Sequence, residues 1–172
     1  MNKMLIAALL AMAGTAQAAD QTEGGVYVGL GLGRADGGNA VFKTGGSPSF
    51  AGSLGYRFQS PLALELYWRS LSFELFPASQ SGNYEYPDRH VGVAVVGRLP
   101  LGEALSATAR LGVGRTSMDR SGSGASTKQR TSMSGGVGLS YALGRKVSVT
   151  LGYERFSKID TGVTLLGAEI RF

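Results

Sequence analysis

Hydrophobic and polar residues alternate with period two in eight stretches of the chain, and helical periodicity is nearly absent. In each stretch one parity is mostly large and apolar, and the other is mostly small or polar. Most stretches have about ten residues, the length that a tilted strand needs to cross a bilayer. The predicted strands are residues 25–34, 49–58, 62–69, 90–99, 105–115, 131–141, 147–154 and 162–172.

Eight charged residues within these stretches share the parity of the small and polar residues. A charge on the lipid face near the middle of a bilayer costs roughly 2–4 kcal/mol, so this parity should face away from lipid. A soluble barrel would need the reverse, with its large apolar residues inside. We therefore predict a luminal charge network, which either compensates buried charges or gates a narrow pore. Its members are Arg57, Glu65, Arg69, Arg98, Arg110, Glu154, Glu169 and Arg171.

The links between the stretches alternate in length. Residues 59–61, 100–104 and 142–146 form short links, whereas the links at 35–48, 70–89 and 116–130 are long and polar. Short turns on one side and long loops on the other are typical of outer-membrane barrels. Only a closed barrel leaves no unpaired strand edge in lipid. The pattern predicts an all-β fold, an eight-stranded antiparallel up-and-down transmembrane β-barrel.

Aromatic residues on the apolar parity lie near the ends of the predicted strands. If both termini are periplasmic, three of them mark the inner membrane interface and two mark the outer one, as aromatic girdles do. These interface aromatics are Phe58, Tyr141 and Phe172 at the inner side, with Phe50 and Trp68 at the outer side.

The first residues have the features of an export signal. Lys3 supplies a positive charge, residues 4–13 are apolar, and Ala16-Gln17-Ala18 fits the small-x-small cleavage rule. A membrane anchor is the alternative, but about ten apolar residues are too few to span a core of roughly 30 Å as a helix. We predict a signal peptide at residues 1–18 and a barrel domain at residues 19–172.

Composition narrows the function classes. The chain has 27 glycines and no cysteine, so disulfides and thiolate metal sites are excluded. Many glycines lie within strands, where a narrow lumen needs small residues. The formal net charge of +5 comes from scattered residues, without the basic patch that nucleic-acid binding requires. We expect no nucleic-acid partner, no metal site and no cofactor.

Several segments give the chain a family resemblance. They are Gly25-Val26-Tyr27-Val28-Gly29, Leu62-Ala63-Leu64-Glu65, Gly97-Arg98-Leu99-Pro100-Leu101, Leu151-Gly152-Tyr153-Glu154-Arg155-Phe156 and Ala168-Glu169-Ile170-Arg171-Phe172. With these segments the chain resembles the transmembrane domain of OmpA and its small OmpX-like relatives. The resemblance implies a protein of the outer membrane, and recognition of the strand ending at Phe172 by the barrel-assembly machinery. Because the chain ends there, we expect no peptidoglycan-binding domain. We expect a monomer, although the sequence does not distinguish a monomer from a dimer.

The favoured functional hypothesis is a non-enzymatic barrel with a structural, envelope-integrity or adhesion-type surface role. Eight strands leave a lumen that side chains can fill. The alternative is a lipid A acylase or deacylase, with a centre at Asp88-Arg89-His90 and a serine nucleophile. His90 is the only histidine, but we interpret it as a polar rim residue and assign no catalytic residue. The serines considered are Ser70, Ser72, Ser79 and Ser81.

The third long link and its flanks carry four basic residues against the single acid Asp119. Guanidinium and ammonium groups make charge-assisted hydrogen bonds to phosphates, so this cluster is a candidate contact for lipopolysaccharide. A solvated loop without a ligand is the alternative. The candidates are Arg115, Arg120, Lys128 and Arg130.

Overall fold

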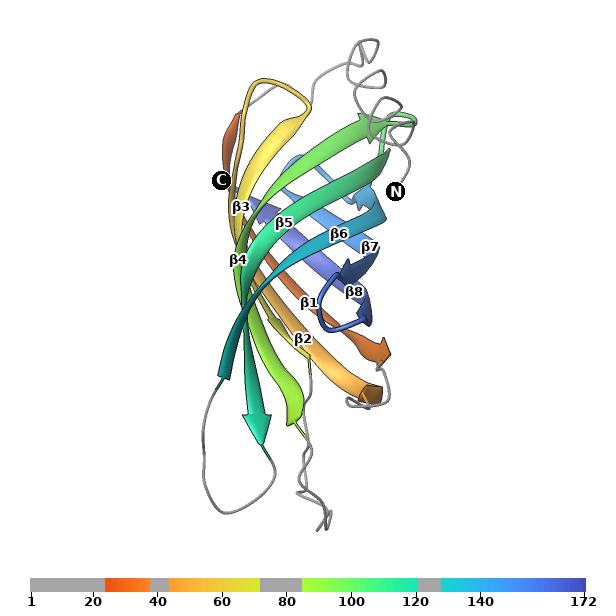
Figure 1. Ribbon diagram of the computed structural model, residues 1–172. Helices are drawn as coiled ribbons and strands as arrows, with labels where there is room; N and C mark the ends of the chain where they lie inside the picture. The colour runs from red at the N-terminus through yellow and green to blue at the C-terminus, as the bar shows by residue number, and fades with distance from the viewer. Residues whose placement is uncertain (1–23, 38–43, 72–84, 121–127) are drawn as a thin grey trace, which may run out of the picture.

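Eight antiparallel strands close into one barrel in this computed structural model, and β1 completes the closure by pairing with β8 (Figure 1). The structure describes residues 24–37, 44–71, 85–120 and 128–172, so the predicted signal peptide lies outside the described residues. The described part contains no helix long and apolar enough to cross a membrane. The predicted fold is confirmed. The strands are β1 (Gly25–Gly37), β2 (Thr44–Arg57), β3 (Leu62–Ser70), β4 (Glu85–Pro100), β5 (Leu105–Arg120), β6 (Lys128–Ala142), β7 (Val147–Phe156) and β8 (Thr161–Arg171).

The two parities face opposite sides of the barrel wall, as alternation along a strand requires. In β3, for example, Leu64 is 51% exposed on the outside while its neighbour Glu65 is 6% exposed in the lumen. The outward face of every strand is dominated by exposed apolar side chains. This inside-out arrangement is confirmed in all eight strands.

Both chain ends described by the structure lie at one end of the barrel, which we call the terminal end; the opposite end is the loop end. Phe172 N–H donates to the Val26 carbonyl at the terminal end. The short links after β2, β4 and β6 also lie there, as Figure 1 shows. The predicted short links therefore share one end of the barrel, whereas the predicted bounds of the long links are wrong, because strands occupy residues 35–37, 44–48, 85–89, 116–120 and 128–130.

The strands extend further into the long links than the side-chain pattern predicts. β5 and β6 stay paired as far as Met118 and Lys128, and Glu85 of β4 pairs with Arg120 of β5. Much of the link predicted at residues 116–130 is therefore strand, because a backbone ladder continues through polar residues whose side chains carry no alternating signal. We call residues 85–89, 115–120 and 128–131 the β4–β6 extension; they reach toward the loop end (Figure 1).

Lumen-facing glycines make room for two buried tyrosine rings. A Cβ added at Gly55 would overlap the ring of Tyr27, its partner across β1 and β2. A Cβ at Gly112 would lie 2.7 Å from the hydroxyl oxygen of Tyr67. Glycine is abundant in these strands because the lumen is narrow and the aromatic rings occupy it.

We expect Gly55→Ala to lower the free energy of unfolding by about 1–3 kcal/mol, the usual cost of overpacking a filled interior. Gly52→Ala on the same strand is the matched control, because its Cβ would face outward at 3.7 Å from Trp68. Urea titration in detergent micelles, with unfolding followed by tryptophan fluorescence, measures both. Equal stabilities of the two variants would show that the Tyr27 ring does not need the glycine.

Candidate functional site

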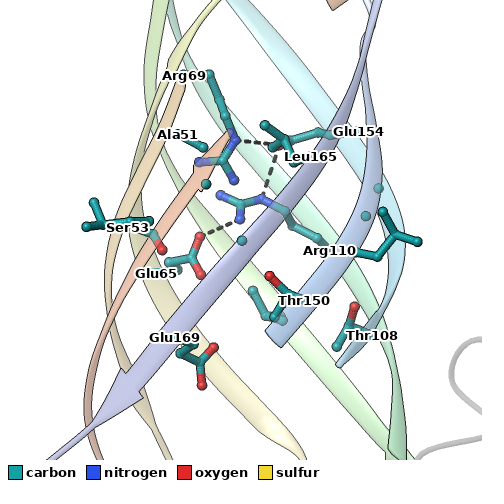
Figure 2. A pocket seen from close by; sticks show the side chains of 18 of the residues that line it. Ala51, Ser53, Glu65, Arg69, Thr108, Arg110, Thr150, Glu154, Leu165 and Glu169 are labelled. Carbon is teal, nitrogen blue, oxygen red and sulfur yellow. Dashed lines mark hydrogen bonds and ion pairs between the residues drawn. The ribbon is translucent and has the colours of Figure 1, made fainter. Parts of the chain in front are cut away.

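The centre of the lumen holds a balanced cluster of two arginines and two glutamates from β3, β5 and β7 (Figure 2). The Arg69 Nε atom lies 3.0 Å from one oxygen of Glu154, and the Arg110 Nε atom lies 3.2 Å from the other. Arg110 also pairs with Glu65. All four side chains are at most 13% exposed. Because burying unpaired charges is costly, this mutual neutralisation is what allows them to occupy the lumen.

A second cluster lies nearer the terminal end and is not balanced. Glu169 of β8 accepts from Arg57 of β2 at 2.7 Å and also pairs with Arg98 of β4. The Tyr27 ring lies against both guanidinium groups, with their Cζ atoms 5.9 and 5.8 Å from its centroid. Its hydroxyl donates to Glu65 at 2.9 Å, so Tyr27 links the two clusters.

Seven of the eight charged residues assigned to the lumen from sequence form ion pairs with one another. The eighth, Arg171, lies at the terminal end and donates to the carbonyl of Arg145. Tyr27 and Tyr67 belong to the same luminal network, although sequence reasoning did not single them out. The signal for them was a large aromatic residue on a parity that is otherwise small or polar.

His90 lies inside the barrel, which corrects its interpretation as a rim residue. It is fully buried, and its ring nitrogens contact the hydroxyls of Tyr67 at 2.9 Å and Thr116 at 2.8 Å. The Phe156 ring covers it, with centroids 4.8 Å apart. His90 has the same parity as the other lumen-facing residues of β4, and β4 continues past it toward the loop end, so the rim lies several residues away.

The residues of the alternative enzymatic centre do not come together around His90. The side chain of Arg89, next to His90 in the chain, is 61% exposed, and its Nε atom lies 3.9 Å from a carboxylate oxygen of Asp88. Ser70 is buried, and its carbonyl accepts a hydrogen bond from Ser49. The other serines considered, Ser72, Ser79 and Ser81, lie outside the described residues. An acid–histidine–serine relay needs a carboxylate at one ring nitrogen, and here hydroxyl groups occupy both positions.

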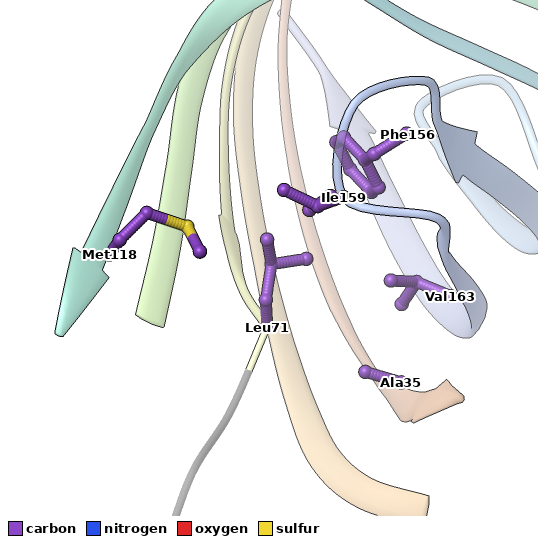
Figure 3. Packing of buried hydrophobic residues seen from close by; sticks show 6 residues of the cluster. All are labelled: Ala35, Leu71, Met118, Phe156, Ile159 and Val163. Atoms are coloured by element: carbon purple, nitrogen blue, oxygen red, sulfur yellow. The ribbon is translucent and has the colours of Figure 1, made fainter. Parts of the chain in front are cut away.

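A buried apolar cluster lies at the loop end of the barrel (Figure 3), and we call it the loop-end seal. Its members are each at most 1% exposed. The turn after β7 contributes Ile159: Asp160 has a positive φ of 47° there, and its carboxylate pairs with Arg155. Sequence analysis did not find this seal, because Ile159 lies in a link rather than in an alternating strand. The seal consists of Ala35, Leu71, Met118, Phe156, Ile159 and Val163.

The four basic candidates for lipopolysaccharide contact are strand residues rather than loop residues. Arg115 is exposed on the outward parity of β5. Arg130 is opposite the buried Thr116 in the β5–β6 ladder, on the lumen parity. Arg120 is the last residue of β5 and Lys128 is the first residue of β6; the structure describes their backbone but not their side chains. Arg115 and Arg130 therefore lie on opposite faces of the wall.

The interface aromatics all lie on the outward parity. Phe58, Tyr141 and Phe172 are at the terminal end and are 45%, 53% and 73% exposed. Trp68, 41% exposed, is near the loop end of β3, where Phe50 of β2 is partly exposed. The part played by Phe172 in barrel assembly stays a prediction. Among the residues that the structure describes, no group of three potential ligands for a metal ion is present.

The chain matches one protein family and is similar in fold to several solved structures. Residues 5–172 match the family model described as the outer membrane protein beta-barrel domain. Neisserial surface protein A has a similar structure, with 20% identity, a TM-score of 0.62 and coverage of 87% of this chain and 99% of that one. No curated protein sequence matches.

Two further solved barrels resemble the chain. Ail, the attachment invasion locus protein of Yersinia pestis, is 22% identical, with a TM-score of 0.57 and coverage of 89% of this chain and 100% of that one. A second Ail structure contains the heparin analogue sucrose octasulfate. The N-terminal barrel of Pseudomonas aeruginosa OprF is 14% identical, with a TM-score of 0.58 and coverage of 87% and 100%. At these identities the likeness is one of fold.

Proposed function

The chain belongs to the outer membrane protein beta-barrel domain family, and we propose that it is a sealed, non-enzymatic barrel of the outer membrane with a structural or surface-interaction role. The observation that carries this proposal is the filled lumen. Ion pairs occupy its centre, and an apolar seal closes the end that faces outward in the predicted orientation.

The space left at the centre of the lumen is small. A cavity of about 140 Å³ lies beside the central ion pairs, between residues such as Thr108, Thr150 and Leu165. An ion that left this cavity toward the loop end would have to pass Phe156 and Leu71, which are fully buried. Apolar side chains offer no ligands to replace the hydration shell of an ion, and a narrow apolar constriction closes by dewetting. These features support a structural use of the charges over gating.

We expect no single-channel events when the protein, isolated from outer membranes, is inserted into planar bilayers. Insertion is checked separately by the mobility difference between boiled and unboiled samples recovered from vesicles of the same lipid. Discrete conductance steps in the inserted wild-type protein would reject the sealed barrel and favour the narrow pore.

The β4–β6 extension supports the surface-interaction part of the proposal. It continues the barrel wall at the end predicted to face the exterior, and its sequence carries Arg115, Arg120, Lys128 and Arg130. Arg115 lies two residues beyond Val113 on the same outward face, and Val113 is 45% exposed. In a membrane, that position meets the polar headgroups of the outer leaflet. We propose that Arg115 contacts a phosphate of lipopolysaccharide there.

Arg115→Ala is expected to weaken lipopolysaccharide binding by roughly tenfold, the value of one charge-assisted hydrogen bond at a phosphate. Arg130→Ala is the matched control, because Arg130 has the lumen parity and should leave binding within about twofold. Fluorescently labelled lipopolysaccharide titrated into the protein in micelles measures both, with heparin as a competing polyanion. Equal effects of the two substitutions would mean that general charge, rather than the outward face, attracts the ligand.

A further inference from the structure

The terminal end of the lumen opens into a cavity of about 350 Å³ with an unusual charge balance. It lies between the ends of β2 and β8 and the turns that follow β4 and β6. Its acids are Glu103, in an exposed turn, and Glu169, at the inner end. Its cations are Arg57, Arg98, Arg145, Lys146 and Arg171. Five positive charges thus meet two negative ones around one cavity.

The inner end of this cavity has hydrogen-bond donors to spare. Glu169 is the one carboxylate paired with both Arg57 and Arg98 in the described structure. The Nε atoms of both arginines are buried without an acceptor among the described residues. The Arg57 side chain is only 9% exposed. A guanidinium group has five N–H donors and no acceptor, so a shared carboxylate leaves both groups incompletely satisfied.

The central cluster also holds buried donors without an acceptor among the described residues, on Arg110, but it has no excess of positive charge. There, two arginines face two glutamates and the charges cancel. At the terminal end, Arg145 and Lys146 of the turn after β6 add to the excess of positive charge. Hydroxyls also line the cavity: Ser140 accepts from Arg98 at 3.4 Å, and Ser106 and Ser148 lie nearby. The described residues around this polar recess therefore carry more positive charge than their carboxylates offset.

We propose that this cavity binds an oxyanion of the phosphate class. Guanidinium groups present paired donors that match the oxygens of phosphate, and hydroxyls add neutral hydrogen bonds to the same ligand. The anion adds a second acceptor group beside Glu169 for Arg57 and Arg98 and offsets the excess charge. Its source is either free phosphate in the periplasm or the phosphate of an anionic phospholipid headgroup in the inner leaflet. The proposal does not depend on the sealed state of the loop end.

Inorganic phosphate is the first probe. The full protein, isolated from outer membranes into a non-ionic detergent, is titrated with phosphate while the amide resonances of Ala104 and Ser148, which line the cavity, are followed by NMR. We expect saturable shifts at these amides. Sodium chloride at the same ionic strength should not reproduce these shifts. Salt screens all exposed charges in the same way and does not place an oxyanion in the cavity.

Two exposed turn residues provide opposite controls that leave the luminal ion pairs intact. Lys146→Gln should weaken phosphate binding, and Glu103→Gln should strengthen it, each by roughly threefold for a charge near the cavity mouth. Arg98→Gln should abolish the shifts, provided that the unboiled protein keeps the mobility of the folded barrel. If that variant fails to fold, the Lys146 and Glu103 pair still tests the site.

The source is identified with lipid nanodiscs. Shifts at Ala104 and Ser148 in phosphatidylglycerol nanodiscs without added phosphate, absent in phosphatidylcholine nanodiscs, would assign the site to an anionic headgroup. Shifts with free phosphate in either lipid would assign it to the soluble anion. The proposal is overturned if neither probe gives saturable shifts, if chloride gives the same shifts, or if the two turn substitutions change the affinity in the same direction.

Discussion

Glu154→Gln is expected to lower the free energy of unfolding by about 3–5 kcal/mol, the usual cost of breaking a buried ion pair from one side. Glu154 is 4% exposed and holds both Arg69 and Arg110. Without its charge, the central cluster keeps two guanidinium groups and only the carboxylate of Glu65. Glutamine has the same shape, so the loss reports charge compensation rather than packing.

Urea titration of the protein in phospholipid vesicles, followed by the mobility of unboiled samples, measures this loss. Glu103→Gln, in the exposed turn after β4, is the control and should change stability by less than about 0.5 kcal/mol. If Glu154→Gln were as stable as the control, the luminal charges would be solvated and the filled-lumen interpretation would be wrong.

Phe156→Ala is expected to lower the free energy of unfolding by about 3–5 kcal/mol, the range for removing a buried aromatic ring from a packed interior. Phe156 is fully buried in the loop-end seal and also covers His90. Its loss leaves a cavity beside Leu71 and Ile159, and it exposes the His90 ring to water from the loop end.

The matched control is Phe58→Ala, because Phe58 is outside the barrel and 45% exposed. Phe58→Ala should lower the free energy of unfolding by less than half as much. Most contacts of the Phe58 side chain are with the lipid outside the barrel rather than with a packed interior. Vesicle-based urea titration compares the two directly, and proton exchange at the His90 ring, followed by NMR, reports access of water. If Phe156→Ala changed neither the stability nor the rate of proton exchange at His90, we would conclude that the loop-end seal does not close the lumen.

The alternating pattern was sufficient to derive the side of the wall that each strand residue faces. The period of two is a local property of extended backbone, so the lumen parity of Glu65 and Arg69 follows from β3 alone. The cost of a charge in lipid then determines which face is inside. Eight strands with alternating long and short links lead directly to a closed antiparallel barrel.

Other features depend on contacts between distant strands. Arg69 meets Glu154, 85 residues away, because closure and strand tilt bring β3 opposite β7 across the lumen. Such a meeting depends on register, which a single strand does not specify. The same holds for the β4–β6 extension, where backbone pairing continues through Thr116 and Ser117 without a side-chain pattern to announce it.

Sequence alone therefore determined the barrel, its inside-out polarity and the charged residues that line the lumen, because those follow from alternation and from the cost of charge in lipid. Only the tertiary structure decided which charges pair, that His90 is enclosed under Phe156, and that Ile159 folds inward to complete the seal. These depend on the packing of side chains from several strands in one narrow space. The surplus of positive charge at the terminal end has the same origin, since it arises where Arg57, Arg98 and Glu169 from three strands converge.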